Sequence, residues 1–373
     1  MDQLLLGLTS ITLKQVVMYI IGGALIYLAI VKEYEPTLLL PIGFGAILVN
    51  IPFSSAIDQV SGGAVQPGAL SLLFNAGIIT ELFPLLIFLA VGAMIDFTPL
   101  LQNPVMLFFG AAAQFGIFFT MCLATLCGFS LKEAASIGII GAADGPTSIY
   151  VATRFAKNLL GPISVAAYSY MSLVPIIQPP VIKALTTHEE RCIKMEYRPE
   201  GVSKTTKVLF PIIVTFIAGI VAPSSVSLIG FLMFGNLIRE CGVLNGLSKT
   251  AQNELANLVT ILLGITIGST MTADKFLQPR TLMILGIGLL AFVFDTAGGV
   301  IFVKILNLFL KKKINPMIGA AGISAFPMSA RVIHKMGQKE DPSNFLLMHA
   351  VGANVAGQIG SVIAGGLILA LIK

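Results

Sequence analysis

Long apolar runs separated by short polar stretches dominate the chain. Each half contains about six runs, and several reach or approach the roughly 20 residues that a membrane-spanning helix requires. The runs cover residues 16–31, 36–51, 82–96, 104–127, 132–155 and 160–184, then 207–222, 225–241, 255–273, 281–310, 316–336 and 344–372. This pattern predicts an all-α polytopic membrane protein with about 10 to 12 membrane segments.

The two halves of the chain resemble each other. The stretch "PTLLLPIGFGAILVN" at 36–50 matches "PSSVSLIGFLMFGNL" at 223–237, and "IGAADGPTSIYVATR" at 140–154 matches "IGAAGISAFPMSAR" at 318–331. Because the matches occur in the same order, we infer an internal duplication. The predicted domains are a first membrane repeat at 1–185, a basic cytoplasmic connecting loop at 186–206 and a second membrane repeat at 207–373.

The relative orientation of the two repeats depends on how often each half crosses the membrane. An even number of crossings would make the repeats parallel, whereas an odd number would invert the second repeat. Secondary transporters often use inverted repeats, and several of the runs are short enough to be re-entrant. We therefore expect inverted repeats with discontinuous helices at the site.

Composition agrees with a membrane protein. Of 373 residues, 56% are hydrophobic and only 11% are charged, whereas soluble domains carry about 25% charged residues. The net charge of +5 is concentrated around the connecting loop, where Lys183 to Lys207 holds six lysines and arginines. Short loops rich in Lys and Arg lie on the cytoplasmic side, so topology explains this charge and no nucleic-acid partner is expected.

The first residues and the cysteines add little chemistry. The opening "MDQLLLGLTSITLKQ" has no basic n-region or small-residue cleavage site, so we expect no removable signal peptide. Cys122, Cys127, Cys192 and Cys241 lack the spacing of a metal cluster or of a disulfide framework. We expect them to be small buried residues.

The fifth run of each half is interrupted at a corresponding place. Asp144 precedes Gly145 and Pro146 in one half, and the second interruption runs from Gly322 to Pro327. Proline inside a helix costs about 3 kcal/mol, and glycine costs about 1 kcal/mol. Since paired interruptions in corresponding segments indicate the binding site of a transporter, we place the functional site here.

Asp144 is the main candidate residue. It can cap the helix that restarts at Gly145, and Ser324 can do the same before Pro327. A purely structural cap is the alternative for Asp144. However, a carboxylate at bilayer depth costs at least about 2.5 kcal/mol, and serine or asparagine would cap without that cost. The pattern therefore favours ion or proton handling at Asp144.

Other polar residues in apolar runs have two interpretations each. Tyr168 and Tyr170 are typical of an interfacial belt or of a proton donor inside the bundle. Arg331 either reaches the membrane surface or binds an anion, because guanidinium matches carboxylate geometry. Asn354 offers an amide oxygen of the kind that Na⁺ accepts, and Asp295 either serves the pathway or pairs with a buried donor.

Four long motifs resemble one known family. They are "GAADGPTSIYVATRFA", "SYMSLVPIIQPPVIKALTT", "NPMIGAAGISAFPMSARV" and "NFLLMHAVGANVAGQIGS". Over nearly its whole length the chain is similar to the beta subunit of the sodium-pumping biotin-dependent decarboxylases, which act on oxaloacetate, methylmalonyl-CoA or glutaconyl-CoA. The chain is short for the oxaloacetate type, which favours an acyl-CoA system.

The resemblance implies a translocase that decarboxylates carboxybiotin, consumes a proton and exports Na⁺. It assigns Na⁺ binding to Asp144 and proton donation to Tyr170 rather than Tyr168. It also implies that Ser324 takes part in Na⁺ or proton exchange and that Arg331 holds carboxybiotin. The remaining motif positions fall on Asn315 and Gly319 for carboxybiotin and on Asn354 for Na⁺.

The resemblance also implies partner subunits, a cofactor and a location for the chain. Carboxybiotin would be presented by a biotinyl carrier subunit, with a carboxyltransferase subunit and a small membrane-anchored gamma/delta-type subunit in the same oligomeric complex. No covalent cofactor is expected on this chain, and the expected location is the cytoplasmic membrane of a bacterium or archaeon. The alternative is a stand-alone secondary transporter, such as a Na⁺/H⁺ antiporter. A passive channel suits the broken helices less well than alternating access does.

Overall fold

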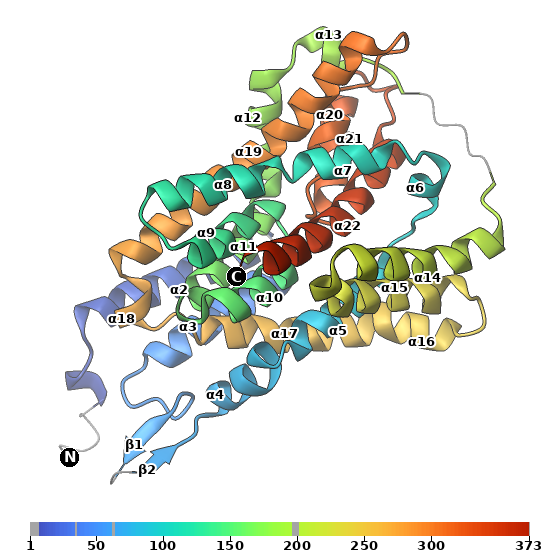
Figure 1. Ribbon diagram of the computed structural model, residues 1–373. Coiled ribbons are helices and arrows are strands. Elements are labelled where there is room, and N and C mark those ends of the chain that lie inside the picture. Colours follow the sequence, from blue (N-terminus) through green and yellow to red (C-terminus); the bar gives the residue numbers. More distant parts are fainter. Residues whose placement is uncertain (1–6, 34–35, 62–63, 196–200, 373) are drawn as a thin grey trace.

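The computed structural model describes residues 7–33, 36–61, 64–195 and 201–372, which form a mostly helical protein (Figure 1). The helices of the first half are α2 (Leu13–Val31), α3 (Pro36–Asn50), α4 (Ala69–Leu73), α5 (Leu82–Met94), α6 (Thr98–Gln102), α7 (Met106–Ala113), α8 (Phe115–Leu126), α9 (Leu131–Gly138), α10 (Gly145–Phe155), α11 (Leu160–Ser172), α12 (Val174–Leu185) and α13 (His188–Arg191). A two-stranded antiparallel sheet of β1 (Gln59–Ser61) and β2 (Ala64–Gln66) lies between α3 and α4. The expectation of a helical fold is thus confirmed except for this small hairpin.

The second half continues with longer helices. They are α14 (Lys204–Val221), α15 (Val226–Glu240), α16 (Asn245–Thr250), α17 (Ala256–Gly268), α18 (Ala273–Phe276), α19 (Pro279–Phe309), α20 (Met317–Ala320), α21 (Met328–Glu340) and α22 (Leu347–Leu371). Short irregular helices join several of them: η1 (Phe74–Ile79), η2 (Ile139–Ala142), η3 (Lys157–Leu159), η4 (Pro223–Ser225) and η5 (Ala251–Leu255).

Fewer segments than expected are long enough to cross a membrane. Five helical stretches of the described chain are long and apolar enough to cross a membrane, or up to seven if each bent helix pair is one span. The estimate of 10 to 12 membrane segments is therefore not confirmed. The physical reason is that several apolar runs are interrupted, for example at η2 and between α20 and α21, so that neither piece is long enough by itself.

Six helices form a continuous row, which we call the panel. Neighbours along it pack in the order α2, α3, α17, α5, α15 and α14. The inner helices exchange halves, since α3 of the first half packs on α17 of the second half, and α15 packs on α5. Asn50 on α3 donates to the carbonyl of Met271 at 2.8 Å, and Asn236 on α15 donates to that of Ile95 at 3.0 Å. Each asparagine thus holds the segment just after the helix on which it packs, Met271 after α17 and Ile95 after α5.

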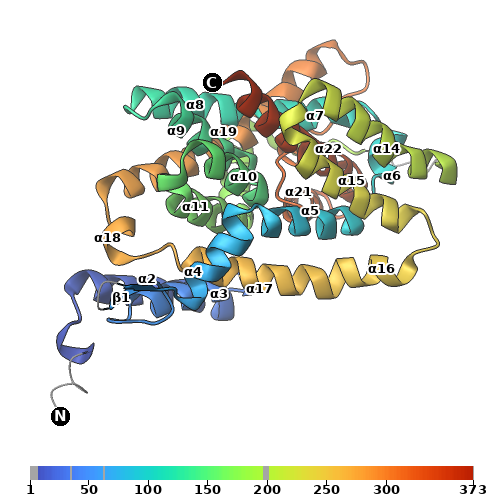
Figure 2. The ribbon, with the colours of Figure 1, turned by 60° about the horizontal axis from the view of Figure 1, so that its bottom comes forward.

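The remaining large helices form a second body, which we call the core. It contains α7 to α12 and α19 to α22, and α10 and α11 face the panel helices α3, α5 and α17 (Figure 2). At one end, shown at the top of Figure 1, α13 packs on α21. There Arg191 donates to Glu340 at 2.9 Å, and this hydrogen bond holds the pKa of the Glu340 carboxyl below its usual value. The core is therefore tied to the segment that connects the two halves.

Glycines allow the panel helices to cross at close range. A Cβ atom on Gly92 of α5 would lie 1.8 Å from the carbonyl oxygen of Leu232 on α15. A Cβ atom on Gly235 would likewise lie 2.0 Å from the oxygen of Leu89. Small residues at such contacts let the backbones of membrane helices approach each other.

We predict that Gly92→Ala destabilises the protein, because the added methyl group forces α5 and α15 apart. The expected loss is about 1–3 kcal/mol, as for other overpacked contacts. The matched control is Gly23→Ala on α2, where nothing lies within 4 Å of the added atom. That control should be neutral or stabilising by up to about 1 kcal/mol. Thermal unfolding of the detergent-purified protein measures both, and equal melting temperatures would contradict the prediction.

Candidate functional site

The two predicted interruptions are present, and they touch each other. The first lies between η2 and α10, where Ala143 adopts a left-handed conformation with φ of 53°. The second is the irregular chain between α20 and α21. The backbone N–H of Ser324, in the second interruption, donates to the carbonyl oxygen of Ala142 at 3.0 Å. Two segments from different halves are thus joined at the point where both helices break.

Asp144 starts the helix α10, as its place before Gly145 predicts. Its Oδ1 atom accepts a hydrogen bond of 3.2 Å from the backbone N–H of Thr147, which confirms that it is the N-cap. Its Oδ2 atom accepts three more bonds, from the hydroxyls of Thr147 and Ser361 at 2.7 Å each and from the amide of Gln358 at 3.4 Å. The side chain is therefore a hub between α10 and α22.

Among the described residues, this carboxylate has neutral donors around it but no positively charged partner. Asp144 is only 2% exposed, and it takes part in none of the ion pairs found in the described ranges. Burying an ionised group without a partner of opposite charge is strongly unfavourable. A cation or a proton held at Asp144 would remove that cost.

The second interruption is fastened to α22. The Ser324 hydroxyl donates to the carbonyl of Gly357 at 2.8 Å. The Asn354 amide donates to the carbonyls of Ala321 and Ile323 at 3.1 and 2.6 Å. Contrary to expectation, Ser324 does not cap the following helix. Pro327 occupies the N-cap position of α21, and the Ser324 hydroxyl donates instead to Gly357 on α22.

A cavity of about 100 Å³ lies where the interruptions meet. The panel contributes mainly apolar walls from α3, α5 and α17, while the core contributes the polar groups. Its polar lining includes Asp144, Tyr168, Thr260, Ser324 and Gln358. The cavity is therefore located between the panel and the core, and nearly all of its chemistry belongs to the core.

Buried oxygen atoms near this cavity lack partners. Within the described chain, neither the Oε1 atom of Gln358 nor the hydroxyl of Tyr168 has a hydrogen-bond partner. The Oδ1 atom of Asn354, one helical turn before Gln358, also lacks one. Hard cations such as Na⁺ bind carboxylate and carbonyl-type oxygens, as Ca²⁺ and Mg²⁺ do. The donor set at Asp144 therefore suits a hard cation.

Tyr170 and Arg331 do not line the cavity. The hydroxyl of Tyr170 is directed to α19, where it donates to the carbonyl of Leu285. Arg331 lies in the first turn of α21 with an exposed side chain, and its guanidinium has no bonding partner among the described residues. Tyr168, whose ring lies against Gly145, is the tyrosine that the structure brings to the cavity.

Asn315 and Gly319 serve the packing of the core. The Asn315 amide donates to the carbonyls of Arg191 and Ile193 at 2.8 and 2.9 Å. A Cβ atom on Gly319 would lie 2.0 Å from the oxygen of Gly299 on α19. These contacts explain both residue types structurally, and a role in carboxybiotin binding remains a prediction for them. Asp295 on α19 is buried and does not line the cavity.

Sequence reasoning missed Thr147, Gln358 and Ser361. The signal was present, since Asn354, Gln358 and Ser361 follow one another at helical spacing of four and three residues in an otherwise apolar and small-residue run. The expectation of buried cysteines was wrong. Cys122 and Cys127 are exposed on the outside of α8 and at its end, the other two are half-buried, and all four are free thiols.

Comparison with known proteins identifies the family. The family described as Na⁺-transporting oxaloacetate decarboxylase beta subunit matches residues 14–372, and the chain belongs to it. A glutaconyl-CoA decarboxylase subunit beta from Acidaminococcus fermentans is 52% identical, over 98% of this chain and 95% of that relative. A methylmalonyl-CoA decarboxylase subunit beta from Propionigenium modestum is 49% identical, over 98% and 96%. An oxaloacetate decarboxylase beta chain from Haemophilus ducreyi is 47% identical, over 99% and 97%.

We predict that Gln358→Leu weakens Na⁺ binding, because leucine has similar bulk but removes both the free Oε1 atom and the amide that donates to Asp144. The expected rise in the Na⁺ concentration for half-maximal thermal stabilisation is about tenfold, or roughly 1.4 kcal/mol. Gln252→Leu is the control, because Gln252 lies on η5 and bonds to Ser248 outside the cavity. If both variants require the same Na⁺ concentration as the unaltered protein, Gln358 is not a ligand.

Proposed function

We propose that this chain is the membrane subunit of a Na⁺-translocating decarboxylase complex. It decarboxylates carboxybiotin presented by a carrier partner and couples that step to Na⁺ export with consumption of a proton. The observation that carries the proposal is the buried Asp144 carboxylate, which lacks a positive partner in the described chain and lies where two broken helices meet. Family membership supports the same function.

In this proposal Na⁺ is the transported cargo and Asp144 supplies the charge that holds it. The orphaned oxygens of Gln358 and Asn354 complete the oxygen environment, and Ser324 lies at the cavity on the other broken segment. The hydroxyls of Thr147 and Ser361 fix the carboxylate in place. Moving one charge against 100 mV requires about 2.3 kcal/mol, so the site has to release Na⁺ to one side only.

Alternating access would take place at the boundary between panel and core. The panel offers smooth apolar walls to the cavity, while the core carries the charged and polar groups. A displacement of the core against the panel would move the site as a unit and leave its hydrogen bonds intact. This arrangement suits two homologous repeats with inverted orientation, and the exchanged packing of α3 and α15 supports such a pair.

Carboxybiotin supplies a carboxyl group whose departure as CO₂ consumes a proton. Arg331 would bind that carboxylate, since its guanidinium is exposed, offers paired donors and has no partner within the described ranges. Tyr170 would donate the proton. In this scheme Asn315 and Gly319 help to bind carboxybiotin indirectly. Their contacts with Arg191 and Gly299 fix the position of α20.

The partners and location follow from the same proposal. They comprise a biotinyl carrier subunit, a carboxyltransferase subunit and a small membrane-anchored gamma/delta-type subunit, assembled in the cytoplasmic membrane of a bacterium or archaeon. The connecting loop at 186–206 would face the cytoplasm, where the carrier arrives. The two acyl-CoA decarboxylase relatives, at 52% and 49% identity against 47% for the oxaloacetate decarboxylase relative, favour an acyl-CoA substrate.

The alternative of a stand-alone Na⁺/H⁺ antiporter is not favoured by the family assignment. It makes a different prediction for the isolated chain. An antiporter would exchange Na⁺ for protons in vesicles without any carboxybiotin. The proposed subunit would take up Na⁺ only while CO₂ is released.

We predict that Asp144→Asn abolishes coupled turnover, because asparagine keeps the helix cap but not the charge. The expected loss of Na⁺-dependent carboxybiotin decarboxylation is on the order of a hundredfold, or about 2.7 kcal/mol. ²²Na⁺ uptake into proteoliposomes holding the whole complex should fall equally. The control is Asp274→Asn, an exposed aspartate that pairs with Lys14. Na⁺-dependent decarboxylation that persists in Asp144→Asn would refute the proposal.

A pair of tyrosine variants tests the proton donor. Tyr170→Phe should lower the decarboxylation rate by about 10²–10³-fold, as expected for the loss of a general acid. Tyr168→Phe should lower it by less than about tenfold, since this variant keeps the ring that packs on Gly145. Rates across a range of pH values, measured on complexes of equal thermal stability, compare the two. The reverse order would assign proton donation to Tyr168, which lines the cavity and whose buried hydroxyl has no partner in the described chain.

A further inference from the structure

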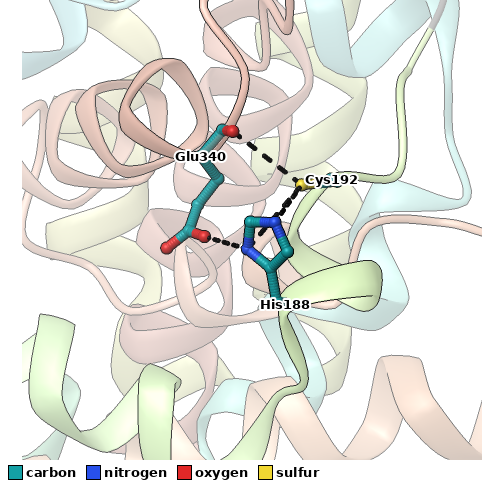
Figure 3. A group of neighbouring side chains, drawn as sticks. All are labelled: His188, Cys192 and Glu340. Atoms are coloured by element: carbon teal, nitrogen blue, oxygen red, sulfur yellow. Dashed lines mark hydrogen bonds and ion pairs between the residues drawn. The ribbon is translucent and has the colours of Figure 1, made fainter.

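Three side chains with metal-binding chemistry meet far from the cavity. His188 and Cys192 come from α13 and the residue after it, and Glu340 ends α21 (Figure 3). Their potential ligand atoms all lie within 4.8 Å of one another, and no other group of this kind was found in the described ranges. The sequence did not predict this group, because Glu340 follows Cys192 by 148 residues.

The distances are close to those of a single tetrahedral ion. The Nδ1 atom of His188 is 2.6 Å from Oε2 of Glu340 and 4.0 Å from Sγ of Cys192. Zinc bond lengths place imidazole, thiolate and carboxylate ligands roughly 3.3–3.6 Å from one another. Figure 3 shows the imidazole ring between the carboxylate and the sulfur. Forming the site would lengthen the Nδ1–Oε2 distance by about 0.7 Å and shorten the Nδ1–Sγ distance by about 0.4 Å.

Surrounding hydrogen bonds already hold the ligands. Arg191 donates to Oε1 of Glu340 at 2.9 Å and to Oε2 at 3.5 Å, and Oε2 also lies 2.6 Å from Nδ1 of His188. The backbone on either side of Cys192 is fixed by the Asn315 amide, which donates to the carbonyls of Arg191 and Ile193. Outer hydrogen bonds of this type orient the ligands of metal sites and strengthen metal binding.

The ligand types favour zinc over the ions of the membrane cavity. Thiolate and imidazole suit Zn²⁺, whereas carboxylate, carbonyl and water suit hard cations. One thiolate and one carboxylate bring two negative charges to a divalent ion, and the carboxylate is shared with the Arg191 guanidinium. The site also combines a His and a Cys four residues apart on one helical turn with a third ligand from another element.

We propose that His188, Cys192 and Glu340 bind one Zn²⁺ ion, with water as the fourth ligand. The ion joins the connecting loop, between the two halves of the chain, to the end of α21, whose beginning carries Arg331. Zn²⁺ thus joins the connecting loop to the end of α21 that lies opposite the second interruption. The site is distinct from the Na⁺ site and does not depend on the proposed function.

The test is zinc binding by the full-length protein, purified without a histidine tag and without added metal. Equilibrium dialysis against buffered Zn²⁺, with zinc measured by mass spectrometry, should give one ion per chain. Replacement by Co²⁺ should produce the near-ultraviolet absorption of a thiolate–cobalt bond. Cys192→Ser should lose both signals and bind Zn²⁺ at least a hundredfold more weakly. Cys241→Ser is the matched control, because Cys241 is half-buried and bonds only to the carbonyl of Ile238 within the described chain.

A second measurement separates a specific site from general metal binding. Zn²⁺ should slow amide hydrogen exchange at 188–193 and 336–341 in the unaltered protein and in Cys241→Ser, but not in Cys192→Ser. All three proteins should have the same exchange pattern without metal, which shows that each is folded. Equal zinc binding by the two variants, or no binding by the unaltered protein at micromolar Zn²⁺, would show that His188 and Glu340 form only an ion pair.

Discussion

A negative charge buried among neutral donors is the constraint on which the rest of the structure depends. Asp144 accepts hydrogen bonds from three side chains and one backbone amide, yet it has no positive partner in the described chain. Neutral donors can hold a carboxylate in position, but they leave its net charge uncompensated in a medium of low polarity. Such a site is therefore in balance only when a mobile cation or proton is present. The uncompensated charge of Asp144 makes the empty site unfavourable, and the same charge attracts the ion to be transported.

The surrounding architecture follows from that constraint. Helix α10 has to begin at Asp144 so that free amides face the carboxylate. Helix α22 has to pass close by, and its glycines make this possible, since a Cβ atom on Gly357 would lie 2.0 Å from the oxygen of Gly322. The second interruption then uses α22 as its support, through Ser324 and Asn354. On α22, glycines thus allow close approach to the broken segments, and polar groups form the hydrogen bonds that hold those segments in place.

The sequence predicted the parts of the structure that have a local cause. The broken segments were located correctly, because glycine and proline disrupt helices wherever they occur, and long runs such as 281–310 and 344–372 closely match α19 and α22. The number of membrane spans was not predictable, since an interrupted apolar run has the same composition as an intact one. The partners of Asp144 depend on contacts across more than 200 residues, as with Ser361. Which of Tyr168 and Tyr170 faces the cavity depends on how α11 is rotated about its axis. The sequence does not specify this rotation, because both tyrosines lie in the same apolar run.

The exchange of helices within the panel also affects how the protein is made. Helix α3 packs on α17 and α5 packs on α15, so these contacts cannot form until the second half has been synthesised. Ribosomes add about 5–20 residues per second, so α3 waits roughly 10 to 45 seconds for α17. During this interval α3 can pack on α2 at Gly43, and Asn50 can donate to Ala46 of its own helix. The contact of Gly45 with α17 and the bond from Asn50 to Met271 form only later. The panel is therefore completed late in synthesis, when α15 and α17 become available to the helices of the first half.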